Sequence, residues 1–273
     1  MPFVEPMLAS ASSKTFPSGT WYAEEKLDGH RLIVSVGEEP SLFGTPVVRA
    51  WSRNGIERAL PTHVRQACEQ LPEGIYDGEI LVPGERSYGT AAIENSEKLL
   101  YVVFDVLRDA GGADLFSVKL RHRRELLETI FAKLGEHRGI KLSTRVRVQS
   151  HEELETLANV VWERDGEGLV VKNDESPYVP GKRPRDWFKV KKLRSAVLTV
   201  IGFREGKLGP HSVLLLRDDE ENETTVKWKT LADLAEIEKD PRRFLGRKLR
   251  IEFQERTPDG GYRHPRWDRW EDE

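Results

Sequence analysis

The feature that most limits the fold of this chain is its series of short alternating apolar segments, whose pattern changes near residue 193. Before that point, five segments bounded by Gly, Pro or Asp predict strands, at 21–36, 47–52, 75–82, 99–107 and 168–172. The first of these is expected to form a strand or one arm of a hairpin. Leucines at helical spacing over 119–134 and a capping-box start at Ser150 predict two helices. We therefore expect an antiparallel sheet core with helices packed outside it, an α+β arrangement.

The shorter second part contains further strand candidates and one helix. The strands are expected at 196–203, 212–216, 224–229, 248–254 and 262–267, and the helix at 231–238, between the third and fourth strands. Five short strands with one helix suit a small, partly closed barrel of the oligonucleotide-binding (OB) kind. We place the domain boundary so that the first domain is 1–193 and the second is 194–273.

Composition excludes several classes of protein. Of the 273 residues, 38% are hydrophobic and 33% are charged, which is typical of a water-soluble globular chain rather than a disordered one. No apolar run approaches the roughly 20 residues that cross a bilayer, and the first residues lack a secretion-signal pattern. The single cysteine, Cys68, excludes an internal disulfide framework. The expected location is therefore cytoplasmic.

Positive charge is concentrated in two stretches, although the formal net charge is -3. Residues 181–194 carry seven basic side chains against one acid, and 241–270 carry nine against four. Such local stretches favour contact with nucleic-acid phosphates, while an ordinary solvated surface is the alternative. The candidates for DNA binding are Lys182, Arg183, Arg185, Lys192, Arg194, Arg247 and Lys248.

The segment with the clearest chemistry is 24–31, which reads EEKLDGHR. Lys26 would project from the end of a strand just before an Asp-Gly turn. A lysine amine attacks only when it is uncharged, so desolvation or nearby cations must lower its pKa. Arg31 offers a planar fork that suits phosphate oxygens. Because a Lys-x-Asp-Gly sequence also occurs by chance, the segment alone leaves its function open.

This segment resembles motif I of the covalent nucleotidyltransferases, the superfamily of ATP-dependent DNA ligases, RNA ligases and mRNA capping enzymes. Segments similar to the other motifs follow in the family's order, at 51–55 (WSRNG), 77–81 (DGEIL), 101–107 (YVVFDVL), 165–172 (DGEGLVVK) and 187–191 (WFKVK). The opening PMLA at 6–9 and the EGLVVK sequence are most similar to small bacterial, archaeal and phage ATP-dependent DNA ligases. The resemblance covers essentially the whole chain.

The resemblance implies an ATP-grasp-like nucleotidyltransferase domain followed by an OB-fold domain. It implies that Lys26 takes AMP from ATP as a lysyl-AMP adduct, which then activates the 5′-phosphate of a nick for attack by the 3′-hydroxyl. Glu79 and Glu167 would hold Mg²⁺ or Mn²⁺, and Phe104, whose default role is core packing, would stack on adenine. The implied ATP- or AMP-binding residues are Glu24, Arg31, Arg53, Glu79, Phe104, Glu167, Lys172, Lys189 and Lys191.

The C-terminus departs from the family pattern. DNA ligases end the barrel with an Arg-x-Asp-Lys element, whereas this chain ends RHPRWDRWEDE. Arg266 or Arg269 is the candidate to orient pyrophosphate instead. The expected partners are nicked double-stranded DNA and a recruiting repair or replication protein, with a monomeric, nucleoid-associated or phage-encoded enzyme and no membrane. An RNA ligase, a capping guanylyltransferase and a non-catalytic nucleic-acid end-binding module remain as alternatives.

Overall fold

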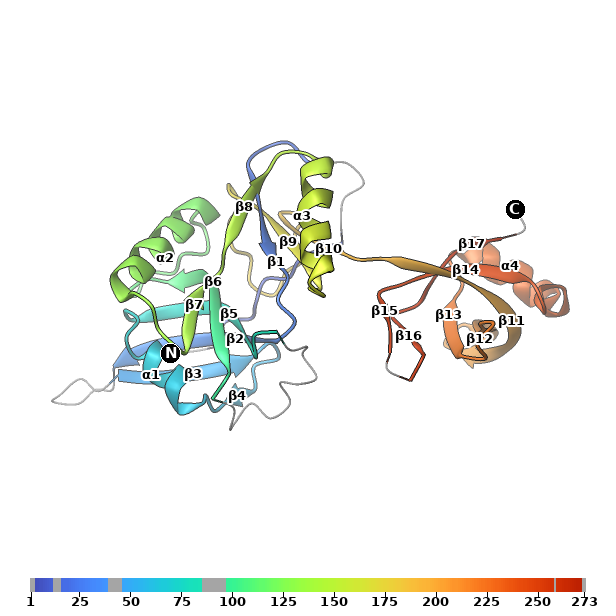
Figure 1. Cartoon of the computed structure of the whole chain (residues 1–273), viewed down its shortest axis with the longest axis horizontal. Helices are drawn as coiled ribbons and strands as arrows, with labels where there is room; N and C mark the ends of the chain where they lie inside the picture. Colours follow the sequence, from blue (N-terminus) through green and yellow to red (C-terminus); the bar gives the residue numbers. More distant parts are fainter. Residues whose placement is uncertain (1–2, 12–15, 39–45, 85–96, 258, 272–273) are drawn as a thin grey trace. The chain divides into compact units, whose positions relative to one another are not determined.

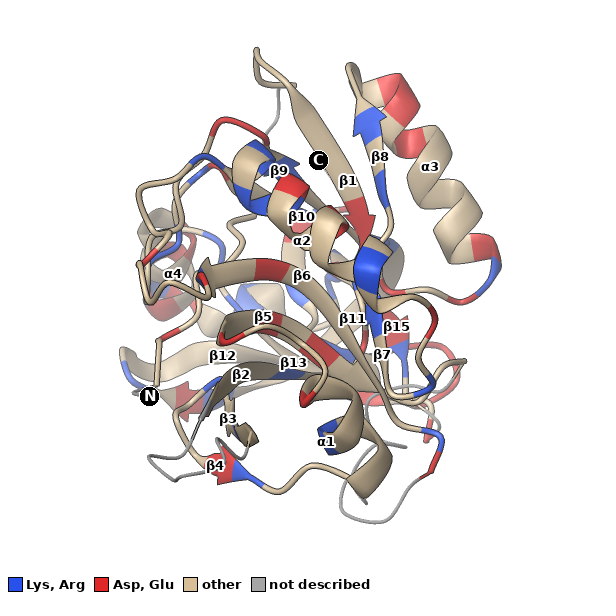
Figure 2. Cartoon of the chain, turned by 90° about the vertical axis from the view of Figure 1, so that its left-hand side faces the viewer, with Lys and Arg blue, Asp and Glu red and all other residues tan. Residues whose placement is uncertain are grey.

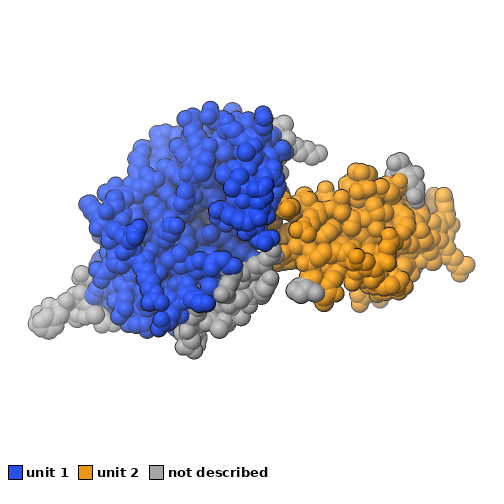
Figure 3. Space-filling model, in the orientation of Figure 1, with its two compact units in different colours: residues 1–190 blue, residues 191–273 orange. Residues whose placement is uncertain are grey.

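The structure, a computed structural model, describes residues 3–11, 16–38, 46–84, 97–257 and 259–271 (Figure 1). The chain divides into two compact units, Met1–Val190 and Lys191–Glu273 (Figure 3). This division lies three residues before the boundary expected after residue 193. None of the helices in the described ranges is long and apolar enough to cross a membrane.

The larger sheet of the first unit has six strands in the order β4-β3-β2-β5-β6-β7. All neighbours are antiparallel except β6 and β7, which are parallel. Helices α1 (Thr62–Cys68) and α2 (Leu120–Leu134) contribute Val64 and Leu127 to the core on one face of this sheet. The strands are β2 (His30–Glu38), β3 (Pro46–Ser52), β4 (Glu57–Arg58), β5 (Gly74–Leu81), β6 (Leu100–Arg108) and β7 (Ile140–Leu142).

The smaller sheet has four strands in the order β10-β9-β1-β8. These strands are β1 (Trp21–Glu25), β8 (Arg145–Val148), β9 (Gly168–Asn173) and β10 (Trp187–Lys191). Helix α3 (His151–Glu163) packs on it through Leu154 and Ala158. The hydroxyl of Ser150 accepts a hydrogen bond from the Glu153 amide, as the expected cap requires.

The two sheets correct the expectation for residues 21–36. This segment is two strands and not one, because β1 pairs with β8 and β9 in the smaller sheet. Its second half, β2, pairs antiparallel with the next strand, β3, as a hairpin arm does, and also with β5. The chain crosses from one sheet to the other at residues 26–29. Gly29 allows this close passage, since an added Cβ would lie 2.3 Å from the Ile80 carbonyl oxygen. The alternation of apolar residues fixes which face of a strand is buried but does not name its partners, so the second sheet was not foreseen.

The second unit is built on a five-stranded antiparallel sheet in the order β13-β12-β11-β14-β17. The last expected strand, 262–267, is divided between two elements, β16 and β17. Within the described residues no backbone pairing joins the edge strands β13 and β17, so the sheet is open rather than a closed barrel. The elements are β11 (Arg194–Gly206), β12 (Gly209–Arg217), β13 (Glu223–Lys227), α4 (Leu231–Lys239), the 3₁₀ turn Pro241–Phe244, β14 (Lys248–Phe253), β15 (Glu255–Arg256), β16 (Tyr262–Arg263) and β17 (Arg266–Trp270).

Candidate active site

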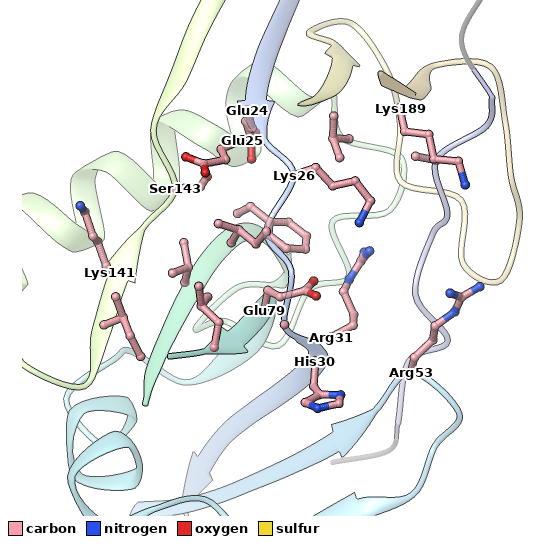
Figure 4. A pocket seen from close by; sticks show the side chains of 18 of the residues that line it. Glu24, Glu25, Lys26, His30, Arg31, Arg53, Glu79, Lys141, Ser143 and Lys189 are labelled. Carbon is pink, nitrogen blue, oxygen red and sulfur yellow. The ribbon is translucent and has the colours of Figure 1, made fainter. Parts of the chain in front are cut away.

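A cavity of about 950 Å³ lies between the two sheets of the first unit (Figure 4). The smaller sheet contributes Glu24 from β1 and Lys172 from β9 to its lining, and the larger sheet contributes Arg31, Glu79 and Phe104. Strands β2 and β5 are paired so that Arg31 lies opposite Glu79. Residues that are far apart in the sequence therefore line one space.

Lys26 enters this cavity from the crossing between the sheets. Its backbone amide donates to the Gly168 carbonyl over 2.8 Å, which fixes the end of β1 beside the start of β9. Its Nζ lies 2.5 Å from Oε2 of Glu167, and both side chains are partly shielded from solvent. Figure 4 shows the side chains of Lys26, Arg31 and Glu79 pointing toward one another. The cavity thus holds an amine, a guanidinium and carboxylates at close range.

Arg31 is held rigidly by a buried carboxylate. Its Nε and its terminal nitrogen Nη2 each donate to Asp77 over 2.6 Å. The same Nη2 also donates to the Met7 carbonyl. The Tyr178 hydroxyl donates to the same carboxylate over 2.6 Å and accepts from the Met7 amide. Burial alone would lower the pKa of Arg31, but the Asp77 carboxylate more than offsets it and raises that pKa. Arg31 is therefore a fixed cation in the cavity wall.

Asp77 and Tyr178 were not among the site residues expected from the sequence. A signal for Asp77 was present, because it lies two residues before Glu79 on β5 and so shares its face of the strand. Tyr178 lies in the connection between β9 and β10, where no strand or helix pattern indicates its position.

Burial raises the pKa of the Glu79 carboxyl to about 7, although the charges of Arg31 and Lys26 act in the opposite direction. Glu79 and Glu167 are both close to Lys26. No cluster of three or more His, Cys, Asp or Glu side chains suited to a metal occurs in the described part of the chain. Two carboxylates nevertheless fit Mg²⁺, which commonly takes one or two protein carboxylates together with substrate phosphates.

Two cations lie close to the ring of Phe104, which lines the cavity. The Arg31 guanidinium carbon is 4.7 Å and the Lys172 Nζ is 4.4 Å from the centre of its ring. Lys172 is buried and lies 2.9 Å from the Glu24 carboxylate. Burial lowers the pKa of Lys172, despite the opposing effect of Glu24. Phe104 also belongs to a core cluster with Trp187, so it both packs in the core and lines the cavity.

Three further basic residues that were expected from the sequence line the cavity, namely Arg53, Arg183 and Lys189, and two that were not expected, Arg58 and Lys141, line it as well. Figure 2 marks Lys and Arg in blue, including those of β8 at the edge of the smaller sheet. Lys191, two residues after Lys189, does not line it, and its Nζ lies 3.4 Å from Oε1 of Gln254. Lys189 and Lys191 were expected to face one cavity. Among the described residues, Lys189 lines it and Lys191 does not.

The other basic residues expected to bind DNA or pyrophosphate lie outside the cavity lining. The Arg247 guanidinium is 4.2 Å from the centre of the Trp270 ring, and the Lys248 Nζ is 3.5 Å from the Asp219 carboxylate. The exposed members of this set are Lys182, Arg185, Lys192, Arg194, Arg266 and Arg269.

Comparisons with known proteins place the chain among DNA ligases. A family model described as the ATP dependent DNA ligase domain matches residues 6–191. The DNA ligase of Methanothermobacter thermautotrophicus is 29% identical over 290 residues, covering 91% of this chain and 50% of that protein. The DNA ligase of Archaeoglobus fulgidus is 29% identical over 204 residues, covering 67% and 35%. The chain thus spans between a third and a half of the length of these curated relatives.

Solved structures share the fold. A Lig E DNA ligase structure matches with a TM-score of 0.73 at 18% identity, covering 97% of this chain and 98% of the other. The ligase domain of LigD from M. tuberculosis matches with a TM-score of 0.57 at 20% identity, covering 99% and 95%. The family match spans every residue that lines the cavity between the two sheets. The chain therefore belongs to the ATP-dependent DNA ligase domain family.

Proposed function

We propose that this protein is an ATP-dependent DNA ligase that seals nicks between a 5′-phosphate and a 3′-hydroxyl in duplex DNA. The observation that carries the proposal is the placement of Lys26 at the crossing between two sheets, within a cavity that also presents Arg31 and Glu79. An amine so placed can reach a phosphate that fixed cations hold. The family match gives the reaction class.

Three transfers at one cavity make up the proposed reaction. The Lys26 nitrogen attacks the α-phosphorus of ATP, the bond to pyrophosphate breaks, and a phosphorus–nitrogen bond forms. A 5′-phosphate oxygen of the nick then attacks the same phosphorus, and the lysine amine leaves. Finally the 3′-hydroxyl attacks the activated 5′-phosphate, and AMP leaves. Glu167, 2.5 Å from Nζ, is placed to take the proton that Lys26 must lose before its attack.

The remaining residues have proposed supporting roles. Arg31, Arg53, Lys172 and Lys189 would stabilise negative charge on the phosphates, while Phe104 and Glu24 would contact adenine. Mg²⁺ or Mn²⁺ held by Glu79 and Glu167 together with the phosphates would neutralise further charge. Lys191, Arg266 and Arg269 would reach the nucleotide only from the second unit or its border. Of these, Arg266 or Arg269 would orient pyrophosphate.

We also propose that residues 1–193 act as the nucleotidyltransferase domain and 194–273 as an OB-fold domain. The strand order of the second unit supports this assignment, and so does the 2.5 Å hydrogen bond from Lys229 Nζ to the Asp268 carbonyl, which links the two edges of the sheet. The basic residues Lys182, Arg183, Arg185, Lys192, Arg194, Arg247 and Lys248 would contact DNA phosphates. The enzyme would act as a cytoplasmic monomer in repair or replication and bind nicks through a recruiting partner.

The test is adduct formation with ATP labelled at the α-phosphate, in the presence of Mg²⁺, followed by denaturing electrophoresis and mass mapping. We expect one AMP on Lys26, none with Lys26→Ala, and a normal amount with the matched control Lys239→Ala on helix α4. The adduct should then seal nicked DNA in preference to nicked RNA. An adduct formed from GTP but not ATP, or mapped to another lysine, would contradict the proposal.

A further inference from the structure

A second groove, of about 520 Å³, lies in the second unit between the two edges of its sheet. Strand β13 and the residues after it form one wall, and Pro265 with the start of β17 forms the other. Because β13 and β17 are the edge strands, the groove marks the line along which the sheet would have to close. Apart from Arg266, a candidate to orient pyrophosphate, no residue that lines the groove has a role in the proposed ligation chemistry.

The groove is basic. Lys227, Lys229 and Arg266 line it and are exposed, and no Asp or Glu lies among its described lining residues. Within the described part of the chain, neither Lys227 nor Arg266 has an acidic side chain at ion-pair distance. Lys229 donates to the Asp268 backbone carbonyl, which is an uncharged acceptor. Three cations without an acid in one groove favour a polyanion as the occupant.

The acidic cluster of the second unit does not cancel this charge. Glu223, at the other end of β13, is paired with Arg217, and the Asp218 carboxylate is held by Arg256 and Tyr262. Four residues of extended strand separate Glu223 from Lys227, about 13 Å. This exceeds the Debye length of about 8 Å at physiological ionic strength, so Lys227 retains an attractive field for an anion.

The groove also offers an aromatic surface. Trp228 lies in its wall between the two lysines and is half-buried, packed against the core of the unit. Its Nε1 is buried and has no hydrogen-bond partner among the described residues, so packing against the core, and not a hydrogen bond, holds the indole. An aromatic ring flanked by cations is the arrangement on which an unpaired base stacks while its phosphates meet the charges. A duplex, whose bases are already stacked, could use only the charges.

We infer that the groove between β13 and β17 is a binding site for single-stranded DNA, with one base on Trp228 and its flanking phosphates on Lys227, Lys229 and Arg266. This site is separate from the cavity that contains Lys26. An enzyme with it can hold a frayed or overhanging strand while the first unit engages the nucleotide. The inference goes beyond nick sealing and does not depend on it.

The test measures binding of a fluorescein-labelled oligothymidylate of about 20 nucleotides to the full chain by fluorescence anisotropy. Trp228→Ala should weaken this binding roughly tenfold or more, and Trp228→Phe should keep it within about threefold. Lys227→Gln should make the slope of log affinity against log salt less negative by about 0.7. All three variants should form the Lys26 adduct at the wild-type rate. The adduct assay therefore tests the proposed ligase activity, and the anisotropy assay separately tests the binding of single-stranded DNA in the groove.

Unchanged affinity in Trp228→Ala would overturn the inference, and so would an equal loss of affinity for intact duplex DNA in that variant. If Trp228→Ala lowers the thermal unfolding midpoint and the adduct yield together, the other two variants decide. Loss of binding in Trp228→Phe, or an unchanged salt slope in Lys227→Gln, then refutes the site. Retained binding with the reduced slope supports it.

Discussion

Replacing Asp77 by Asn tests the physical role of the buried network behind the cavity. The Asp77 side chain is 0% exposed and that of Arg31 is 17% exposed, and two 2.6 Å hydrogen bonds join them. The amide keeps the shape of the carboxylate but removes its charge and turns a donor toward Arg31. Removing one partner of a buried ion pair costs about 3–5 kcal/mol, because the other charge stays buried without compensation. We expect the free energy of unfolding of the first unit to fall by that amount.

Urea titration followed by hydrogen exchange of peptides from each unit measures the loss where it occurs. Tyr178→Phe is the matched control, since it keeps the ion pair and removes the two hydrogen bonds of the hydroxyl. The one to the charged acceptor Asp77 is worth about 1.5–3 kcal/mol. The double variant Arg31→Leu with Asp77→Asn should be more stable than the sum of the two single losses predicts, by about 1–3 kcal/mol. A loss below about 1 kcal/mol for Asp77→Asn, or strict additivity, would refute the reasoning.

Three further changes probe the cavity directly. Lys26→Arg should form no AMP adduct by mass spectrometry, because a guanidinium stays protonated, and any adduct at residue 26 would contradict this. Glu167→Ala should raise the Mg²⁺ concentration needed for half-maximal adduct formation without unfolding the chain, whereas an unchanged Mg²⁺ dependence would remove Glu167 from metal binding. The pKa of Glu79 is raised to about 7, so the native protein keeps a proton that the unfolded chain releases near pH 4.5. Without metal, the wild type should therefore lose stability relative to Glu79→Gln as the pH rises from about 5 to 7 and no further above it, and a difference in unfolding free energy that does not vary with pH would contradict the raised pKa.

Local structure was largely predictable from the sequence because it depends on local rules. The strand at 75–82 and the helix begun by Ser150 follow from alternation and from a side-chain cap. The division of 262–267 into two elements was not predictable in the same way. A non-glycine residue, His264, adopts a positive φ of 52° there, which its residue type does not indicate. Pro265 did argue against an unbroken strand, because proline has no N–H to donate to a neighbouring strand.

Pairing across the molecule was the part that local patterns could not supply. The residues of the cavity were gathered by resemblance of their motifs, but the carboxylate that holds Arg31 comes from another strand, and the hydroxyl that holds Asp77 lies 101 residues further along. Such long-range partners depend on the order of strands in a sheet, which the period of the apolar residues does not encode. The same limit explains why residues 21–36 were not expected to divide between two sheets.

Lys26 lies in the segment that connects the two sheets of the first unit. The position of its amine therefore depends on the distance between these sheets. A core cluster that includes Met7, Ile33 and Tyr178 also contains Phe104 and Trp187, which line the cavity. A small change in that packing, such as Ile33→Val, costs only about 1 kcal/mol of stability. Yet a displacement of about 1 Å at a reacting atom can slow a transfer roughly a hundredfold. The rate of the proposed adduct formation at Lys26 should therefore fall with minor core substitutions that hardly change the melting temperature.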